Sequence, residues 1–349
     1  MKILIVKTSS LGDILHTFPA LSYLRGKFPE ARIDWVVEKP FMDLLVGHPH
    51  LNSVIAVDSK QWRKSFWKAA TQSEIRSVVE SIKKQNYDVV FDLQGNIKSG
   101  IITFLANSSK KVGFSRLNVP EWPNLLFTNT KFDLTEGKNI RDDLLFLLQS
   151  FFNDSSTYND QKVTLPIDES EKLWVSEYLA RILPGGSKTV MVSPGSVWKN
   201  KQMNEVALIE FLQGIQSSEK CFFLFTWGSE KERVMLKKLQ EAFPENSAIL
   251  DKVRLPLLQY IMAQVDLLIS MDSLPLHLCG TTMTPSYGVF GASLASKYNP
   301  KEKAKRYFQS PCPYKKKFST RCPILRTCST GACMQELSAE KLLADFLKE

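Results

Sequence analysis

A carboxylate near the amino end of the chain stands where a buried strand gives way to a helix. Residues 3–6 (Ile-Leu-Ile-Val) have the continuous apolar run of a strand buried on both faces, and Asp13 follows them in a short polar loop. Ligands of open α/β sheets bind at such junctions. A carboxylate there would repel a phosphate but would accept a proton from a hydroxyl, so Asp13 is a candidate general base. The alternative is that Asp13 only caps its helix.

Cations gather just after the predicted strand 53–57. Lys60, Arg63 and Lys64 lie within five residues, together with Trp62. Guanidinium and ammonium groups bind oxyanions, so this set suits a phosphorylated or carboxylated ligand. The alternative is the basic start of a solvated helix.

A second junction of strand, glycine loop and helix follows the predicted strand 87–92. It carries Gln94, Asn96 and Lys98, a polar set that suits sugar hydroxyls or carboxylates. Arg116 comes shortly after the next predicted strand and adds another cation to the chain's first half. We take Gln94, Lys98 and Arg116 as candidate ligand-binding residues.

Two loops of the second half suit a nucleotide. Residues 194–196 offer bare backbone and the hydroxyl of Ser196 before a helix, with Lys201 nearby, and this combination suits a pyrophosphate. The turn 227–229 leads into a helix with Glu230 and Glu232, whose carboxylates could hold ribose hydroxyls. Glutamate is also favoured at helix starts for its own sake, which is the alternative role.

A third loop of the second half combines a carboxylate with an imidazole. Asp272 and Ser273 end a predicted strand, and His277 lies one turn into the following helix. A lone histidine is more often structural than a ligand. The ends of parallel strands meet at one edge of a sheet, however, so the three loops are expected to converge there.

Four cysteines fall within a proline-rich stretch near the carboxyl end: Cys312, Cys322, Cys328 and Cys333. In a reducing compartment, clustered thiols indicate a structural zinc or iron site before disulfides. No two of them are spaced as C-x-x-C, so unliganded thiols and disulfides both stay open as alternatives. The chain has no Asp-x-Asp motif, and its sequence requires no catalytic cation.

Length and composition set the broad class. At 349 residues the chain is long enough for two domains, and 44% hydrophobic with 23% charged residues is typical of a globular protein. Only four apolar residues separate Lys2 from Lys7, too few for a signal-peptide core. The apolar stretch 144–152 is too short to span a membrane, and the stretch 255–270 is interrupted by Asp266. We therefore expect a cytoplasmic protein without a transmembrane segment.

The net charge of +9 favours an anionic partner such as a phosphate or a negatively charged membrane face. The alternative is that the charge serves solubility alone. Aromatic residues do not alternate with basic ones as in RNA-binding sheets, so we expect no nucleic-acid partner. A dehydrogenase is disfavoured because no G-x-G-x-x-G follows the opening strand.

Repeated β/α units must position these residues. Expected strands of the first half are 3–6, 31–38, 53–57, 87–92 and 111–114, and those of the second half are 189–193, 221–225, 248–250, 266–271 and 286–290. The turn-forming segment 153–161 separates the halves. The pattern predicts two doubly wound α/β domains, residues 1–155 and 156–349, with a ligand cleft between them. It leaves open whether the closing helix, 339–347, packs back on the first domain.

Several motifs resemble a known family. Residues 1–21 are similar to the start of the type I lipopolysaccharide heptosyltransferases, ADP-heptose-using glycosyltransferases with the GT-B fold. The likeness continues through 34–38, 62–64, 92–99, 227–229 and the spacing of Asp272 and His277, and it extends to about Gly291. It implies transfer of L-glycero-D-manno-heptose from ADP-heptose to Kdo of the lipopolysaccharide inner core, with Kdo–lipid A as acceptor, peripheral to the inner membrane.

The resemblance also implies roles for the candidate residues. The family's base falls on Asp13, and its acceptor-binding cations fall on Lys60, Arg63 and Lys64. On the donor side, the residue facing the pyrophosphate falls on Lys201, the ribose carboxylate on Glu232 with Glu230 as fallback, and the sugar carboxylate on Asp272, followed by Ser273 and His277.

One departure concerns the donor loop, where the family usually has Asp-Thr-Gly and this chain has Leu274 in place of the glycine. A relative that uses another acceptor or nucleotide sugar therefore stays an alternative. A non-catalytic nucleotide-binding protein of lipopolysaccharide assembly is the second alternative, in which Asp13 would serve as a cap only. The cysteine-rich tail, too, is absent from the best-known members.

Overall fold

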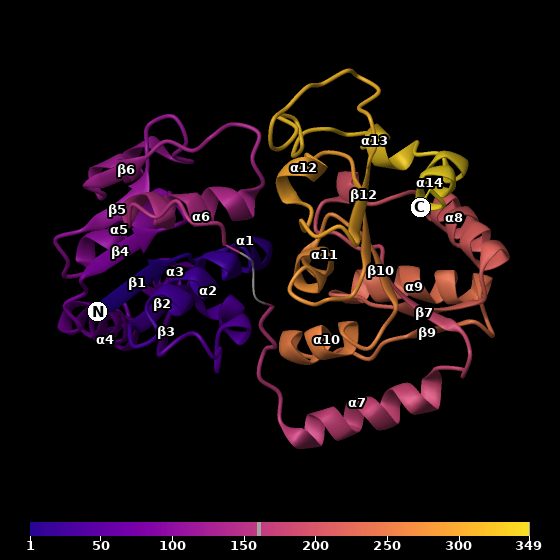
Figure 1. Ribbon diagram of the computed structural model, residues 1–349, viewed down its shortest axis with the longest axis horizontal. Helices are drawn as coiled ribbons and strands as arrows, with labels where there is room; N and C mark the ends of the chain where they lie inside the picture. The colour runs from indigo at the N-terminus through magenta and orange to yellow at the C-terminus, as the bar shows by residue number, and fades with distance from the viewer. Residues whose placement is uncertain (159–161, 349) are drawn as a thin grey trace. The chain divides into compact units, whose positions relative to one another are not determined.

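The chain folds into two α/β units, seen in the computed structural model of Figure 1. The structure describes residues 1–158 and 162–348. One unit is Met1–Pro166 and the other is Ile167–Glu349. The segment 153–161, expected as the linker, lies at the end of the first unit, and its residues 159–161 are outside the described residues.

A six-stranded parallel sheet forms the centre of the first unit, in the order β3-β2-β1-β4-β5-β6. Its strands are β1 (Lys2–Val6), β2 (Arg32–Glu38), β3 (Ser53–Val57), β4 (Val89–Asp92), β5 (Lys111–Phe114) and β6 (Thr130–Phe132). Residues 3–6 of β1 are fully buried, as their apolar run predicts for a strand covered on both faces.

Helices cover both faces of this sheet. They are α1 (Leu11–His16), α2 (Phe18–Lys27), η1 (Lys39–Leu44), α3 (Ser59–Ser65), α4 (Ala69–Lys84), α5 (Ile97–Leu105), η2 (Trp122–Leu126) and α6 (Ile140–Phe151). Trp62 of α3, Ile82 of α4 and Ile102 of α5 pack in one apolar cluster against Leu4 and Val6, so these three helices share one face.

The helix after β1 is interrupted at Thr17, which ends α1 and begins α2. Pro19 explains the break, because a proline near the start of a helix has no N–H to donate to the preceding turn. The short α1 therefore carries Asp13 separately from the longer helix that follows.

The second unit repeats the architecture with the strand order β12-β11-β10-β7-β8-β9, all parallel. Its strands are β7 (Lys188–Ser193), β8 (Cys221–Phe225), β9 (Ser247–Ile249), β10 (Leu267–Met271), β11 (Ser286–Phe290) and β12 (Lys305–Gln309). Its helices are α7 (Glu169–Ile182), η3 (Lys199–Lys201), α8 (Glu205–Ser218), α9 (Glu230–Ala242), α10 (Leu255–Met262), α11 (Leu274–Cys279), α12 (Ala295–Tyr298), α13 (Ala332–Gln335) and α14 (Ala339–Phe346).

The closing helix α14 packs on α8 and β12 of its own unit. Leu342 is fully buried in the apolar core of that unit, and Phe346 meets the ring of Phe211 edge-on at 5.6 Å. Tyr287 adds a hydrogen bond of 2.7 Å to Asp345. These contacts assign α14 to the second unit's core. Among the described residues, no helix is both long enough and apolar enough to span a bilayer.

Candidate active site

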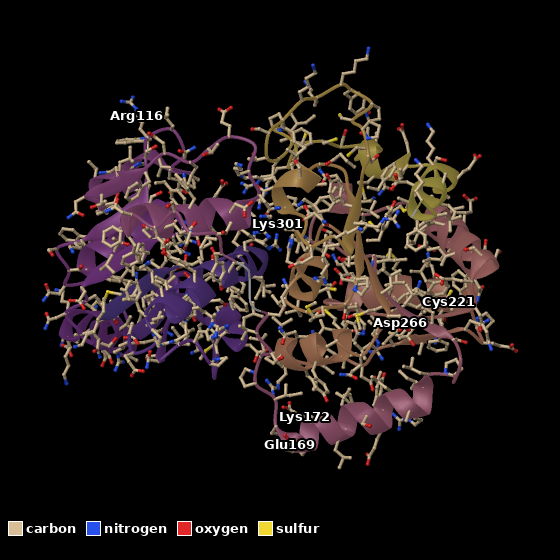
Figure 2. All side chains as sticks on the ribbon, viewed as in Figure 1. Arg116, Glu169, Lys172, Cys221, Asp266 and Lys301 are labelled. Atoms are coloured by element: carbon tan, nitrogen blue, oxygen red, sulfur yellow. The ribbon has the colours of Figure 1, made fainter. Side chains whose placement is uncertain are left out.

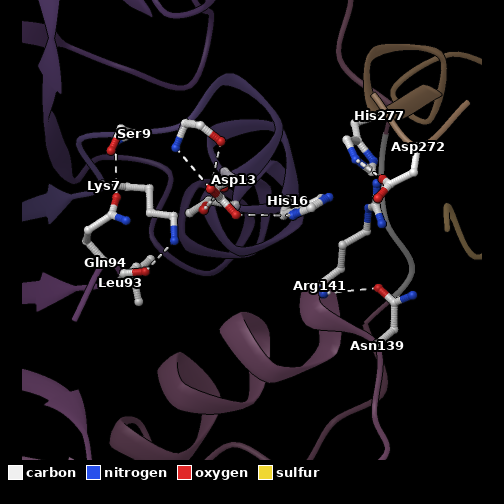
Figure 3. Close-up of polar contacts among 12 residues, drawn as sticks. Lys7, Ser9, Asp13, His16, Leu93, Gln94, Asn139, Arg141, Asp272 and His277 are labelled. Atoms are coloured by element: carbon white, nitrogen blue, oxygen red, sulfur yellow. Dashed lines mark hydrogen bonds and ion pairs between the residues drawn. The ribbon is translucent and has the colours of Figure 1, made fainter. Parts of the chain in front are cut away.

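Asp13 lies in the first turn of α1, directly after the loop that leaves β1 (Figure 3). Its Oδ2 accepts hydrogen bonds from the backbone N–H of Ser10 at 3.0 Å and from the Ser10 hydroxyl at 2.8 Å. The Nδ1 atom of His16 lies 3.9 Å from its Oδ1. Asp13 therefore does cap its helix, and its side chain is still a quarter exposed, which a proton acceptor needs.

Gln94 fixes the loop that leads to Asp13. The side-chain oxygen of Gln94 accepts hydrogen bonds from the backbone N–H groups of Thr8 and Ser9, at 3.1 and 3.0 Å. Next to it, the buried ammonium of Lys7 donates to the carbonyl of Leu93 at 2.7 Å (Figure 3). Because β1 and β4 are neighbours in the sheet, the loop after β4 holds the loop after β1.

Asp92, at the end of β4, in turn fixes the loop of Gln94. Its carboxylate is fully buried and accepts hydrogen bonds from the backbone of Gln94 and Gly95, at 3.0 and 2.9 Å. The Asn124 amide donates to it at 2.6 Å, and the Ser99 hydroxyl at 2.9 Å. Burial raises the pKa of Asp92, while these hydrogen bonds act in the opposite direction. No motif pointed to Asn124, which reaches Asp92 from η2.

Lys98 is part of a polar cluster that the sequence did not predict. Its ammonium lies 2.8 Å from the carboxylate of Glu38, at the end of β2. The hydroxyl of Ser59, at the start of α3, also donates to Glu38. Three strand ends thus contribute to one cluster, and Lys98 remains about one-third exposed beside it.

The expected acceptor cations lie on α3 and in the loop after β5. Lys60, Arg63 and Lys64 are all exposed on α3. Arg116 is exposed after β5 and extends away from its unit (Figure 2). Exposed cations of this kind are accessible to an anionic ligand at low desolvation cost.

Asp272 is the centre of the polar cluster in the second unit. Lys201 donates to its Oδ2 at 2.5 Å, His277 Nε2 lies 3.2 Å from its Oδ1, and the Ser293 hydroxyl also donates to it. Burial alone would raise the pKa of Asp272, but the hydrogen bond from His277 and the charge of Lys201 outweigh it and hold that pKa well below its usual range. Asp272 is therefore ionised. Ser293 follows β11, and sequence reasoning missed it.

Ser273 begins α11 next to this carboxylate. Its hydroxyl is buried and finds no hydrogen-bond partner in the described part of the chain, so it is available to a bound ligand. Leu274 and Pro275 follow as half-buried residues in the first turn. Leu274 is accommodated in a helical conformation, and α11 still begins directly after the strand end.

Glu232, rather than Glu230, faces the loop after β7. Its Oε2 accepts the backbone N–H of Gly228 at 2.7 Å, and a Cβ atom placed on Gly195 would lie only 2.4 Å from its carboxylate carbon. Glycine at position 195 therefore allows this close approach. Glu230 is exposed and lies 3.7 Å from Arg233. The side chain of Ser196 is buried, and its carbonyl accepts a hydrogen bond from the side chain of Gln202 at 2.6 Å.

Comparison with known proteins decides the family. Residues 75–327 match Glycosyltransferase family 9 (heptosyltransferase). The chain belongs to this family. It is an enzyme, a glycosyltransferase of the heptosyltransferase class, as its motifs predict.

Relatives and solved structures agree with this assignment. Lipopolysaccharide heptosyltransferase 1 of Campylobacter coli is 30% identical over 302 residues, covering 84% of each chain. The protein of the same name from Pseudomonas aeruginosa is 28% identical over 298 residues, covering 83% of this chain and 79% of its own. The structure of E. coli heptosyltransferase WaaC with ADP has a TM-score of 0.76 at 24% identity and covers 99% of both chains. The expected GT-B class of fold, with two Rossmann-like units, is confirmed.

The four cysteines of this heptosyltransferase's tail line one small cavity of about 20 Å³. All four are free thiols, and burial, followed by the charges of the other three, raises the pKa of Cys333 to about 11. The fold thus brings together cysteines from a 22-residue stretch. In the described residues, however, no three His, Cys, Asp or Glu side chains are placed to hold a metal ion.

Proposed function

We propose that this enzyme transfers L-glycero-D-manno-heptose from ADP-heptose to Kdo of the lipopolysaccharide inner core, with inversion at the anomeric carbon. Family membership and relatives called lipopolysaccharide heptosyltransferase 1 support this reaction. The observation that carries it is the partly exposed carboxylate of Asp13 at the carboxyl end of β1.

Asp13 acts as the general base. It takes the proton from a Kdo hydroxyl, whose oxygen attacks the anomeric carbon of heptose while the bond to the diphosphate of ADP breaks. The hydrogen bonds from Ser10 fix one carboxylate oxygen, and Gln94 fixes the loop before it. A base held in this way loses little orientational freedom when the acceptor binds. No step is assigned to a metal.

The donor is bound by the second unit. Backbone amides near Ser196, with Lys201, face the diphosphate and stabilise the charge that develops on it. The carboxylate of Glu232 holds the ribose hydroxyls. Asp272 keeps Lys201 and His277 in place and contacts the heptose, and the buried hydroxyl of Ser273 adds a hydrogen bond to the donor.

The acceptor is bound by the first unit. Lys60, Arg63 and Lys64 attract its carboxylates and phosphates, because these cations are exposed on one short helix. Lys98, which is paired with Glu38, and the exposed Arg116 complete the set. Gln94 keeps its proposed contact with the acceptor through its amide NH₂ group, since its oxygen is bonded to the loop backbone.

A transfer assay tests this function. Purified full-length enzyme is mixed with ADP-heptose carrying radiolabelled heptose and with Kdo–lipid A, and we expect label in the lipid product. ADP binding without any transfer would favour a non-catalytic nucleotide-binding protein. Transfer from a different nucleotide sugar, or to a different acceptor, would favour the related enzyme that Leu274 keeps as the second candidate.

We also propose that Cys312, Cys322, Cys328 and Cys333 hold a structural zinc or iron ion. The support is their convergence on one cavity of about 20 Å³, which is about the space of a single small ion or water molecule. Four thiolates are a common ligand set for both metals. Binding would draw the four sulfur atoms inward to metal–sulfur distance.

Elemental analysis of the full-length protein tests the metal. We expect about one zinc or iron per chain, lost in Cys322→Ser and kept in Cys221→Ser, because Cys221 is buried in β8 outside the cluster. Protein purified without stoichiometric metal would end this proposal and leave the transferase function untouched.

The proposed reaction also implies where in the cell the enzyme acts. We infer that it is cytoplasmic and peripheral on the cytoplasmic face of the inner membrane, because its lipid-linked acceptor is presented there. Cell fractionation tests this inference: we expect the enzyme with the membranes at low salt and in the supernatant at high salt.

A further inference from the structure

The segment 60–68, which we call the α3 tip, includes most of α3 and the three residues after it. Trp62 points into the unit and packs against its apolar core, and the buried Ser65 bonds to Thr71 of α4 at 3.0 Å. The tip is therefore anchored on a packed layer of helices. Its outward side chains are presented from a fixed support.

Those outward side chains include four cations: Lys60, Arg63, Lys64 and Lys68. Within the part of the chain that the structure describes, none of the four makes an ion pair or a side-chain hydrogen bond. The longer segment 60–84 has seven Lys and Arg residues against two Glu. The α3 tip is thus a surface of positive charge that the protein itself leaves unpaired.

Two aromatic rings extend from the same tip. Trp67 is 86% exposed and Phe66 is 51% exposed, with their ring centroids 5.9 Å apart. Large apolar side chains that cluster on a protein surface commonly mark an interaction site. Tryptophan flanked by lysine is the composition of protein segments at the membrane–water interface.

A second apolar surface lies on α5 and η2 and consists of Ile97, Ile101, Phe104, Trp122 and Leu126. The charged side chains beside this surface already bond to the protein itself. Glu121 accepts the backbone N–H of Ile97 at 2.8 Å, and Lys111 donates to the carbonyl of Phe104 at 2.9 Å. Charge complementarity therefore favours the α3 tip over the surface on α5 and η2 as a docking site for an anionic surface.

We propose that the α3 tip docks on a bilayer that contains anionic lipids, with Phe66 and Trp67 in the headgroup region and Lys68 facing lipid phosphates. Lys60, Arg63 and Lys64 add to the attraction of the anionic surface and face the lipid-linked acceptor once it is bound. Two signals together, apolar burial and electrostatic attraction, give stable but reversible membrane binding. The proposal rests on the proposed function for its purpose, since a lipid-linked acceptor resides in a bilayer. The docking itself requires no glycosyl transfer.

Vesicle flotation with the full-length enzyme tests the docking. We expect binding to vesicles of phosphatidylcholine mixed with phosphatidylglycerol, little binding to phosphatidylcholine alone, and release by salt. The double variant Phe66→Ser, Trp67→Ser should lower the bound fraction roughly tenfold. Trp122→Ser is the matched control, an equally simple loss of an exposed indole, and should bind as the wild type does.

Two further measurements separate this proposal from its alternatives. Lys68→Glu, which keeps all apolar side chains, should weaken vesicle binding at low salt. The double variant should turn over a soluble Kdo acceptor like the wild type, while its KM for vesicle-borne acceptor rises. Absence of any transfer, with vesicle binding intact, would count against the proposed function alone.

Three results would overturn the docking itself. Wild-type enzyme could fail to float with anionic vesicles, the double variant could float like the wild type, or Trp122→Ser could lose binding to the same extent. Self-association that the double variant abolishes, without vesicle binding by the wild type, would assign the tip to a second copy of the chain instead.

Discussion

Two aspartates follow strand ends in the two units, and they differ in exposure and in the charge of their partners. Asp13 is a quarter exposed and is held by Ser10, three residues away. Asp272 is almost fully buried and is held by Lys201, His277 and Ser293 from two neighbouring strand ends and its own helix. The first is accessible to a substrate hydroxyl, whereas the second is fixed in its charged form. Environment rather than residue type thus divides the two roles that we propose, base for Asp13 and charge anchor for Asp272.

Removing the charge of Asp13 should give the largest effect. Asp13→Asn keeps the size of the side chain and an oxygen for the Ser10 hydrogen bonds, but it cannot take up the acceptor proton. We expect turnover to fall by roughly a thousandfold, with ADP-heptose affinity by calorimetry nearly unchanged.

Ser10→Ala is the matched control for Asp13, because it removes one hydrogen bond to the same carboxylate and leaves the backbone donor. It should cost far less turnover than Asp13→Asn. If Asp13→Asn turned over nearly as fast as the wild type, Asp13 would be a helix cap only, and it would not differ from Asp272 in catalytic role.

Asp272→Asn should affect stability more than any other change at the two strand ends. It leaves the ammonium of Lys201 buried without its negative partner. Breaking a buried ion pair in this way costs about 3 kcal/mol, which denaturant unfolding of the full chain would measure. Glu230→Ala, a change at an exposed carboxylate, should leave the midpoint unchanged. An unaltered midpoint for Asp272→Asn would show that the cluster contributes no net stability.

The acid stability of the wild type should depend on Asp272. Because the folded-state pKa of Asp272 lies below its ordinary value of 3.8, its stabilising effect is complete above about pH 5 and declines as the pH falls further. Below pH 4, the wild type should lose about 1.4 kcal/mol per pH unit through this group. Unfolding measured from pH 7 to pH 3 should show a shallower decline for Asp272→Asn, and parallel curves would contradict the low pKa.

The smallest expected effect is at the loop that supports Asp13. Gln94→Met removes the oxygen that accepts hydrogen bonds from the backbone of Thr8 and Ser9. We expect kcat to fall roughly tenfold, which corresponds to the free energy of about one hydrogen bond. The KM for ADP-heptose should stay unchanged. Gln94→Glu keeps an oxygen that can accept the two backbone hydrogen bonds, so its kcat should recover most of the loss. Equal losses of kcat in both variants would show that Gln94 acts by binding the acceptor substrate and not by holding the loop.

Local patterns predicted ten of the strands and the closing helix, because apolar runs and helical spacing are visible in short windows. The structure adds one edge strand to each sheet, β6 and β12. Both carry a side chain that is exposed to solvent, Lys131 in β6 and Tyr307 in β12, since an edge strand is covered on fewer sides. The first unit extends to Pro166, whose ring lies next to Gly47, a proximity of residues distant in the chain that no local pattern contains.

The sequence by itself determined the order of β and α elements and the polar residues at strand ends, including Asp13, Glu232 and Asp272. Only the tertiary structure decided which of them meet. Gln94 reaches the loop of Asp13 because β4 lies beside β1, and Ser293 reaches Asp272 because β11 lies beside β10. These strands are far apart in the chain, so their adjacency is set by the sheet order, which no local pattern contains.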